Sequence, residues 1–285
     1  DVIDGGAKGD TITGGLGDDT ITGGGGTDVA VFGGVQDDFT IAVAGDGTLT
    51  VTDKNTGTAL GVDTISGVEV LRFTDGDLKV TTAENGDVTL TGTDDVDDVI
   101  TIVGPGGVKL EGAGGADTLT GGDGVDVLDG GAGDDRLVGG LGSDTFVAST
   151  GNDTIVVGGD TADAAQEDHL EIGTEFSLKD GSVNPDTGDL VINLEDQNGD
   201  ASITVEDHTT DTLDSISLDH STKADPRDGV AETYKVAPGL EALTDDNTII
   251  FGSSNDRAAL EAAEGVRGEA ADLLHAAQKP YQLPK

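Results

Sequence analysis

The sequence predicts an all-β protein in which two parallel β-rolls are separated and capped by antiparallel β-modules, with a short C-terminal helix. Three observations support this: two blocks repeat one nine-residue pattern, the segments between and after them alternate with period two, and the last stretch is rich in alanine. The predicted parts are an N-terminal roll (1–31), an antiparallel β spacer (32–92), a second roll (93–156), a β-rich capping module (157–250) and a helix with a tail (251–285).

The nine-residue repeat organises both blocks. Residues 5–13 read GGAKGDTIT, residues 14–22 read GGLGDDTIT and residues 23–31 read GGGGTDVAV, and Asp1 to Asp4 fit the tail of one more unit. The second block keeps one phase from residue 112 to residue 156. Tandem units of this kind predict stacked coils that share one interior.

Each place in the repeat has a physical reason. Glycine at the first, second and fourth places permits positive φ and a backbone path that turns carbonyl oxygens inward. The apolar eighth place lies in a short strand and points into the roll. Carboxylate oxygens at the sixth place and loop carbonyl oxygens are hard ligands suited to calcium. The sixth-place aspartates are Asp10, Asp19, Asp28, Asp117, Asp126, Asp135, Asp144 and Asp153, with Asp1 in the fragmentary unit.

The chain is strongly acidic, with 57 Asp and Glu against 14 Lys and Arg and a formal net charge of -43. Like charges about 4 Å apart cost roughly 1 kcal/mol in water and several times more near a protein surface, so this composition favours bound divalent cations. Nucleic acid and anionic membranes are not expected partners, because both need basic patches. No apolar run approaches the roughly 20 residues of a membrane span, and the first residues do not resemble a signal peptide. The second absence carries no conclusion about export, because Asp1 falls within a repeat.

The energetics of one repeat predict folding that depends on metal. Burial of one Ile or Leu contributes roughly 1.5 to 3 kcal/mol. Fixing nine backbones costs about 1 to 2 kcal/mol per residue, which strand hydrogen bonds recover only in part. We therefore expect a largely disordered chain that forms its rolls when calcium binds.

The pattern G-G-x-G-x-D-x-U-x resembles the nonapeptide of the repeats-in-toxin family and covers about 80 of the 285 residues. The resemblance implies right-handed parallel β-rolls in which two nonapeptides make one turn and calcium lies between loops two repeats apart. It also implies a secreted, extracellular or cell-surface protein, with calcium ions and the type I secretion machinery as partners.

Carried onto this sequence, the resemblance implies a set of metal-binding residues. The aspartate pairs are Asp10 with Asp28, Asp117 with Asp135, Asp126 with Asp144, and Asp135 with Asp153, and Asp1 joins Asp19 if upstream chain completes the first loop. The loop carbonyls are those of Gly6, Gly15, Gly17, Gly24, Gly26, Gly122, Gly124, Gly131, Gly133, Gly140, Gly142 and Gly151. We expect about five to seven calcium ions in all.

Three departures from the pattern change individual units. Lys8 replaces a fourth-place glycine, and Ala30 is a small eighth-place residue. Extending the second block backwards gives VGPGGVKLE at residues 103–111, where Val108 stands in the aspartate place. We expect that unit to keep its strand and to lose its metal.

The spacer changes period from nine to two. FTIAVAGDGTLTVTD, from Phe39, alternates around Asp46-Gly47, which is a strong hairpin signal, and the segment from Asp63 leads to another Asp-Gly turn. It resembles the β-module that often follows repeat blocks in large exported bacterial proteins. We favour a structural spacer that caps one roll and starts the next; the alternative is a ligand-binding module.

An acidic cluster follows the spacer, where the nine-residue phase slips. We favour a solvated acidic turn there, and an additional cation site is the alternative. The members of the cluster are Asp94, Asp95, Asp97 and Asp98.

The repeats stop after residue 156. Residues 168–218 alternate again, with a hairpin signal at Asn198-Gly199, and are placed to cover the last open edge of the roll. Residues 256–278 are alanine-rich and predict a helix. The tail is interpreted as an uncleaved export signal, with a plain terminal helix or an internal cleavage site as alternatives.

No motif demands an enzyme. The metalloprotease H-E-x-x-H, the lipase G-x-S-x-G and the phosphate-binding G-x-x-x-x-G-K are absent, and there is no cysteine. We expect the four histidines to be ordinary surface or hairpin residues: His169, His208, His220 and His275.

Two function classes remain. The first is the calcium-responsive folding and secretion region of a larger exported protein. The second is a calcium-dependent structural surface protein, such as a surface-layer, adhesin or biofilm matrix component, with self-association or a cell-surface polysaccharide as its interaction. A third, a polysaccharide-modifying enzyme, would need a catalytic domain upstream of Asp1.

Overall fold

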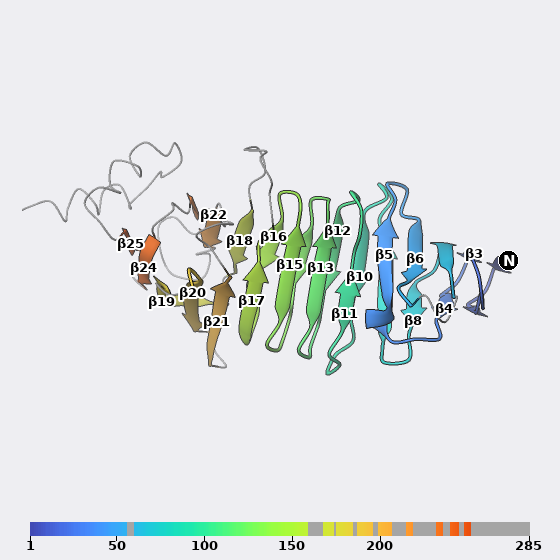
Figure 1. Cartoon of the computed structure of the whole chain (residues 1–285), viewed down its shortest axis with the longest axis horizontal. Coiled ribbons are helices and arrows are strands. Elements are labelled where there is room, and N and C mark those ends of the chain that lie inside the picture. The colour runs from blue at the N-terminus through green and yellow to red at the C-terminus, as the bar shows by residue number, and fades with distance from the viewer. Residues whose placement is uncertain are drawn as a thin grey trace, which may run out of the picture.

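The coils stack side by side along the long axis of the molecule (Figure 1). This is seen in a computed structural model, which describes residues 1–55, 60–158, 168–173, 175–184, 187–195, 199–206, 215–218, 232–235, 240–244 and 248–251. The predicted all-β class is confirmed. The predicted helix at 256–278 and the tail lie outside the described residues.

The first block forms parallel coils with two nonapeptides per turn. Ile3 pairs with Ile21 and Ile12 with Ala30, so pairing partners lie 18 residues apart, on two different sheets. The apolar eighth place therefore recurs at the same height in every coil, as the repeat predicts. The strands are β1 (Val2–Gly6), β2 (Thr11–Ile12), β3 (Thr20–Gly24) and β4 (Val29–Val31).

The spacer both adds a coil and builds antiparallel hairpins. β7 pairs parallel with β3, and β8 pairs parallel with β4. The hairpin predicted at Asp46-Gly47 joins β5 to β6, where Thr48 N–H donates to Asp46 Oδ1 at 3.0 Å and Gly47 has a φ of +80°. The elements are η1 (Gln36–Asp38), β5 (Phe39–Val43), β6 (Leu49–Asp53), β7 (Val62–Ser66), β8 (Val70–Arg72), β9 (Asp77–Thr82) and β10 (Val88–Thr91).

The second block repeats the parallel coil, and one sheet runs through both blocks. β9 pairs antiparallel with β8 and β10, and β10 pairs parallel with β12, so the 11-stranded sheet passes across the spacer. On the opposite side a parallel bridge joins Ile41 of β5 to Ile102. The strands are β11 (Val99–Thr101), β12 (Val108–Glu111), β13 (Thr118–Gly122), β14 (Val127–Asp129), β15 (Arg136–Gly140), β16 (Thr145–Val147) and β17 (Asn152–Val156).

Antiparallel strands cover the end of the second block. β18 and β21 continue the two sheets in parallel, and β20 pairs antiparallel with β21, as the Asn198-Gly199 signal predicts. The strands are β18 (His169–Ile172), β19 (Ser177–Val183), β20 (Leu190–Glu195), β21 (Asp200–Val205), β22 (Ser215–Leu218), β23 (Glu232–Lys235), β24 (Leu240–Thr244) and β25 (Thr248–Phe251).

The interior is a thin aliphatic layer between the two sheets. Leu119 and Leu128, from consecutive strands of opposite sheets, are completely buried. In the described part of the chain, aromatic rings pack against one another in the spacer, where the ring centroids of Phe32, Phe39 and Phe73 lie 5.2 to 5.4 Å apart. Within the described part of the chain, no helix is long and apolar enough to cross a membrane.

Candidate metal centres

A ladder of carboxylates runs along each edge of the rolls. Within a block, the Oδ1 atom of a sixth-place aspartate accepts the backbone N–H of the residue that holds the sixth place one coil earlier. All four internal pairs expected from the repeats are brought together in this way. The N···O distances are 2.8 Å from Asp10 to Asp28, 2.8 Å from Asp117 to Asp135, 2.9 Å from Asp126 to Asp144 and 3.1 Å from Asp135 to Asp153.

The first coil follows the same geometry. The nitrogen of Asp1 lies 2.5 Å from Asp19 Oδ1, while the Asp1 side chain itself is exposed. Asp10 is half-buried, whereas Asp19 and Asp28 are buried.

The second carboxylate oxygen points into the loop. Four Oδ2 atoms are buried and have no hydrogen-bond partner, although a buried polar atom normally has one. An isolated buried carboxylate costs several kcal/mol, so these atoms require a counter-charge or a proton. They belong to Asp19, Asp28, Asp117 and Asp135.

Each Oδ2 atom faces the first glycine of its own repeat. A Cβ atom on Gly112 would collide with Asp117 Oδ2 and with the carbonyl oxygen of Gly130, which belongs to the next coil. A carboxylate oxygen and a carbonyl oxygen thus approach one point that a side chain would fill. An unpartnered carboxylate oxygen beside a carbonyl oxygen fits a bound cation.

The second- and fourth-place glycines adopt the backbone conformation that the repeat predicts. Of the twelve predicted carbonyl donors, all but Gly122 and Gly124 have positive φ, between 91° and 142°. A side chain at either of these two would still collide with the backbone of the preceding coil. The donors with positive φ are Gly6, Gly15, Gly17, Gly24, Gly26, Gly131, Gly133, Gly140, Gly142 and Gly151.

The carbonyl oxygens of these loops lie between stacked coils. Gly6 O accepts the N–H of Gly25 at 2.7 Å, and Gly122 O accepts the N–H of Leu141 at 2.9 Å. A carbonyl oxygen has two lone pairs, so one hydrogen bond leaves one pair for a metal ion.

In the second block, burial disfavours the ionised form of four ladder aspartates. Burial raises the pKa of Asp117 to about 6 and the pKa of Asp153 to about 6, and the nearby carboxylate of Asp135 adds to both shifts. Burial also raises the pKa of Asp126 and of Asp135. The low-polarity surroundings disfavour the charged form, and a cation would reverse this preference.

The donor set suits calcium. It consists of carboxylate and carbonyl oxygens, which are the ligands of hard cations. Among the residues that the structure describes, no three Asp, Glu or His side chains gather as one metal-binding group. The candidate centres therefore combine ladder aspartates with backbone carbonyls, and bound calcium would supply the positive charge that the buried Oδ2 atoms lack.

The three departures from the repeat are accommodated differently. Lys8 is exposed, and Ala30 is completely buried at the core position of its strand. Val108 keeps its place in β12 and donates its N–H to Asp126 Oδ1 at 2.9 Å, but it carries no carboxylate. The ladder contact thus survives at Val108 while a ligand is lost.

The acidic cluster divides into two parts. Asp94, Asp95 and Asp97 are exposed, which agrees with the favoured solvated turn. Asp98 is completely buried and belongs to the ladder, because its N–H donates to Asp117 Oδ1 at 2.7 Å. For Asp98 the expectation of a solvated residue was therefore wrong.

The place of Asp98 in the ladder can be recognised in the sequence. Asp98-Val99-Ile100-Thr101 matches the end of a nonapeptide, but six positions separate Gly92 from Asp98, where Gly112 and Asp117 are only five apart. One extra loop residue displaced the phase without changing the strand.

Three further ladder residues lie outside the repeats. Asp19 N–H donates to Asp63 Oδ1 at 2.9 Å, Asp28 N–H donates to Glu69 Oε2 at 2.8 Å, and Asp144 N–H donates to Asp168 Oδ1 at 2.8 Å. Asp168 directly precedes β18, as most sixth-place aspartates precede their strands, and Asp63 is the second residue of β7, while Glu69 has no nonapeptide signal.

Of the four histidines, the structure describes His169, whose backbone N–H donates to the carbonyl oxygen of Asp144 at 2.8 Å. His169 lies at the start of β18 and is half-buried. His208, His220 and His275 lie outside the described residues.

Comparison with known proteins identifies the repeats. A family model, the RTX calcium-binding nonapeptide repeat, matches residues 1–30, 111–146 and 138–161 in 4 copies. The resemblance to the repeats-in-toxin family is thereby confirmed, and these repeats imply calcium binding. No curated protein matches the chain.

Among solved structures, the chain is similar to the crystal structure of the extracellular lipase LipA from Serratia marcescens. The two sequences are 21% identical with a TM-score of 0.26, and the match covers 70% of this chain and 36% of the lipase chain. The matched part thus spans about a third of the length of the lipase.

Proposed function

We propose that this chain, which carries RTX calcium-binding nonapeptide repeats, is the region of a larger secreted bacterial protein that folds on calcium binding after type I export. In this proposal the region has no catalytic function of its own. It binds about five to seven calcium ions between its stacked coils.

The observation that carries the proposal is the row of buried, unpartnered carboxylate oxygens. Asp28 is 0% exposed and Asp117 is 1% exposed, yet each has an Oδ2 atom without a hydrogen-bond donor. The thin aliphatic interior offers little to offset several such groups. Calcium bound in the loops would turn this destabilisation into cohesion between coils.

Calcium concentration would then control when the chain folds. Free calcium is scarce inside cells, so an acidic glycine-rich chain would remain unfolded and could pass through a narrow export channel. Outside the cell, modules with dissociation constants of about 10⁻⁴ to 10⁻³ M would fill. Successive binding along the ladder would draw the chain outward and order the neighbouring modules.

Calcium titration followed by far-UV circular dichroism tests the proposal. The chelated chain should show little β-signal and gain it as calcium is added. Asp126→Ala and Asp135→Ala should weaken this response. Asp94→Ala should not, because Asp94 is exposed and makes no ladder contact. A β-signal that is complete under excess chelator, or equal effects of all three substitutions, would contradict the proposal.

A structural surface protein is the second candidate. It is favoured by apolar side chains that stand out from the roll loops, where Leu16 is 75% exposed and Val125 is 65% exposed. Light scattering separates the two candidates. Calcium-driven growth into large regular assemblies supports the surface protein, and a compact monomer supports the secretion region.

A further inference from the structure

We infer that the spacer supplies calcium ligands of its own: Asp63 and Glu69 complete two sites whose first halves are Asp19 and Asp28. This inference rests on the proposed function. Neither residue belongs to a nonapeptide, and the family model stops at residue 30 in this block. Two sites of the first block would therefore each take one carboxylate from the spacer.

The contacts reproduce those of the regular repeats. Asp19 N–H donates to Asp63 Oδ1 at 2.9 Å, and Asp28 N–H donates to Glu69 Oε2 at 2.8 Å. The reference contact, from Asp117 N–H to Asp135 Oδ1, measures 2.8 Å. β7 and β8 bring the two spacer residues into place because they continue the parallel pairing of β3 and β4.

The loop at Gly23 also brings together a carboxylate oxygen and a carbonyl oxygen, as a regular coil does. A Cβ atom on Gly23 would collide with Asp28 Oδ2 and with the carbonyl oxygen of Gly67. Gly112 has the same two neighbours, Asp117 Oδ2 and the carbonyl oxygen of the next coil. Gly67, a spacer residue, thus stands where a motif glycine stands elsewhere.

The buried halves of these sites need a cation. Asp19 and Asp28 are 3% and 0% exposed, and the Oδ2 atom of each has no hydrogen-bond partner. Among the described side chains, neither Asp63 nor Glu69 forms an ion pair with Lys or Arg. Each site thus pairs two carboxylates, one on each of two stacked coils, and the site of Asp28 and Glu69 adds the carbonyl oxygen of Gly67, a donor set that fits a hard divalent cation such as calcium.

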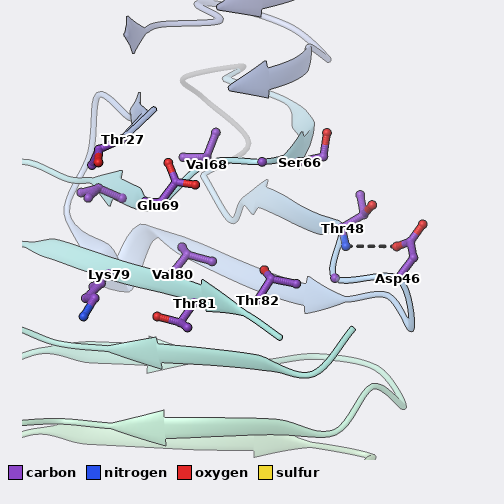
Figure 2. A pocket seen from close by; sticks show the side chains of 13 residues that line it. Thr27, Asp46, Thr48, Ser66, Val68, Glu69, Lys79, Val80, Thr81 and Thr82 are labelled. Carbon is purple, nitrogen blue, oxygen red and sulfur yellow. Dashed lines mark hydrogen bonds between the residues drawn. The ribbon is translucent and has the colours of Figure 1, made fainter. Parts of the chain in front are cut away.

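Glu69 is half-buried, so part of its surface remains in reach of an entering ion. It lines a groove of about 590 Å³ together with Thr27 and Val68, where Figure 2 shows the three side chains close together. Asp63, by contrast, is 6% exposed. We therefore expect the site of Glu69 to exchange its ion faster than the site of Asp63.

Calcium titration calorimetry of the full chain tests the inference, with Glu69→Gln and Asp63→Asn as the variants. Each amide retains an oxygen that can accept the N–H from Asp28 or Asp19, so the hydrogen bond is kept while the charge is removed. Each variant should lose one ion or bind it roughly tenfold more weakly. Glu84→Gln is the matched control, because Glu84 is an exposed spacer residue, and it should bind as the natural chain does.

Asp135→Asn separates this inference from the proposed function. If Asp135→Asn lowers calcium binding while Glu69→Gln and Asp63→Asn do not, the inference is overturned and the proposed function stands. If all three leave binding unchanged, the proposed function fails.

Hydrogen exchange of the unsubstituted chain covers the case in which a variant does not fold. Calcium should slow amide exchange at residues 62–72 as strongly as at residues 118–129. If calcium slows exchange at residues 118–129 but leaves exchange at residues 62–72 unchanged, the inference is overturned.

Discussion

Acid should stabilise the metal-free fold and weaken the calcium-bound one. Burial raises the pKa of Asp117 from 3.8 to about 6 and has the same effect on Asp153. Because the folded pKa lies above the unfolded one, protonation favours the folded state. The stabilisation is complete below about pH 3.8 and is lost as the pH rises through about 6.

The magnitude follows from the size of the shift. A pKa raised from 3.8 to about 6 makes the ionised Asp117 at most about 3 kcal/mol less favourable in the folded chain at neutral pH. Solvent that reaches the loop reduces this figure. The same direction holds for Asp98, Asp126 and Asp135, whose pKa values burial also raises. The free-energy costs of ionising these aspartates therefore add up along the ladder.

Two circular dichroism titrations measure this effect. Under excess chelator, the β-signal should rise as the pH falls from neutral toward 4. With calcium, the midpoint calcium concentration should rise over the same range, because protons compete with the ion for the carboxylates.

A variant locates the effect in the ladder. Asp117→Asn should reduce both pH dependences, whereas Asp123→Asn should not, because Asp123 is exposed. A chelated chain that loses β-signal on acidification, or a calcium midpoint independent of pH, would refute the reasoning.

Three further predictions concern stability in the calcium-bound state, measured by urea unfolding. Gln36→Ala should lower the free energy of unfolding by about 2 to 4 kcal/mol, because the Gln36 amide donates to Asp98 Oδ1 at 2.6 Å and accepts the Val99 N–H at 2.7 Å. An unchanged urea midpoint would contradict this. Gly133→Ala should lower the free energy of unfolding by more than about 2 kcal/mol, because φ is +142° and the added methyl group would collide with the carbonyl oxygen of Gly115. The control is Gly25→Ala, where φ is not positive and no backbone atom is close, and equal stability of the two variants would contradict the prediction. Leu128→Ala should cost about 2 to 5 kcal/mol, against about 0.5 or less for the exposed Val125→Ala, and similar losses for both would count against a single-layer core.

The nonapeptide blocks were predictable because each repeat carries its own pairing rule. Two units make one turn, so within a block a sixth-place aspartate meets the one 18 residues later, as Asp117 meets Asp135. The positive φ of Gly133 and the burial of Leu128 follow from their places in the same unit. Local sequence is sufficient here, since all coils make equivalent contacts.

The joining of the two blocks was decided by tertiary structure alone. Asp63 and Glu69 meet their ladder partners across 44 and 41 residues, and Gln36 reaches Asp98 across 62. Period-two alternation identifies strands, but it does not specify which strand lies beside which. That choice depends on where the sheets of the first roll leave an open edge, and the spacer's burial and hydrogen bonding are satisfied only there.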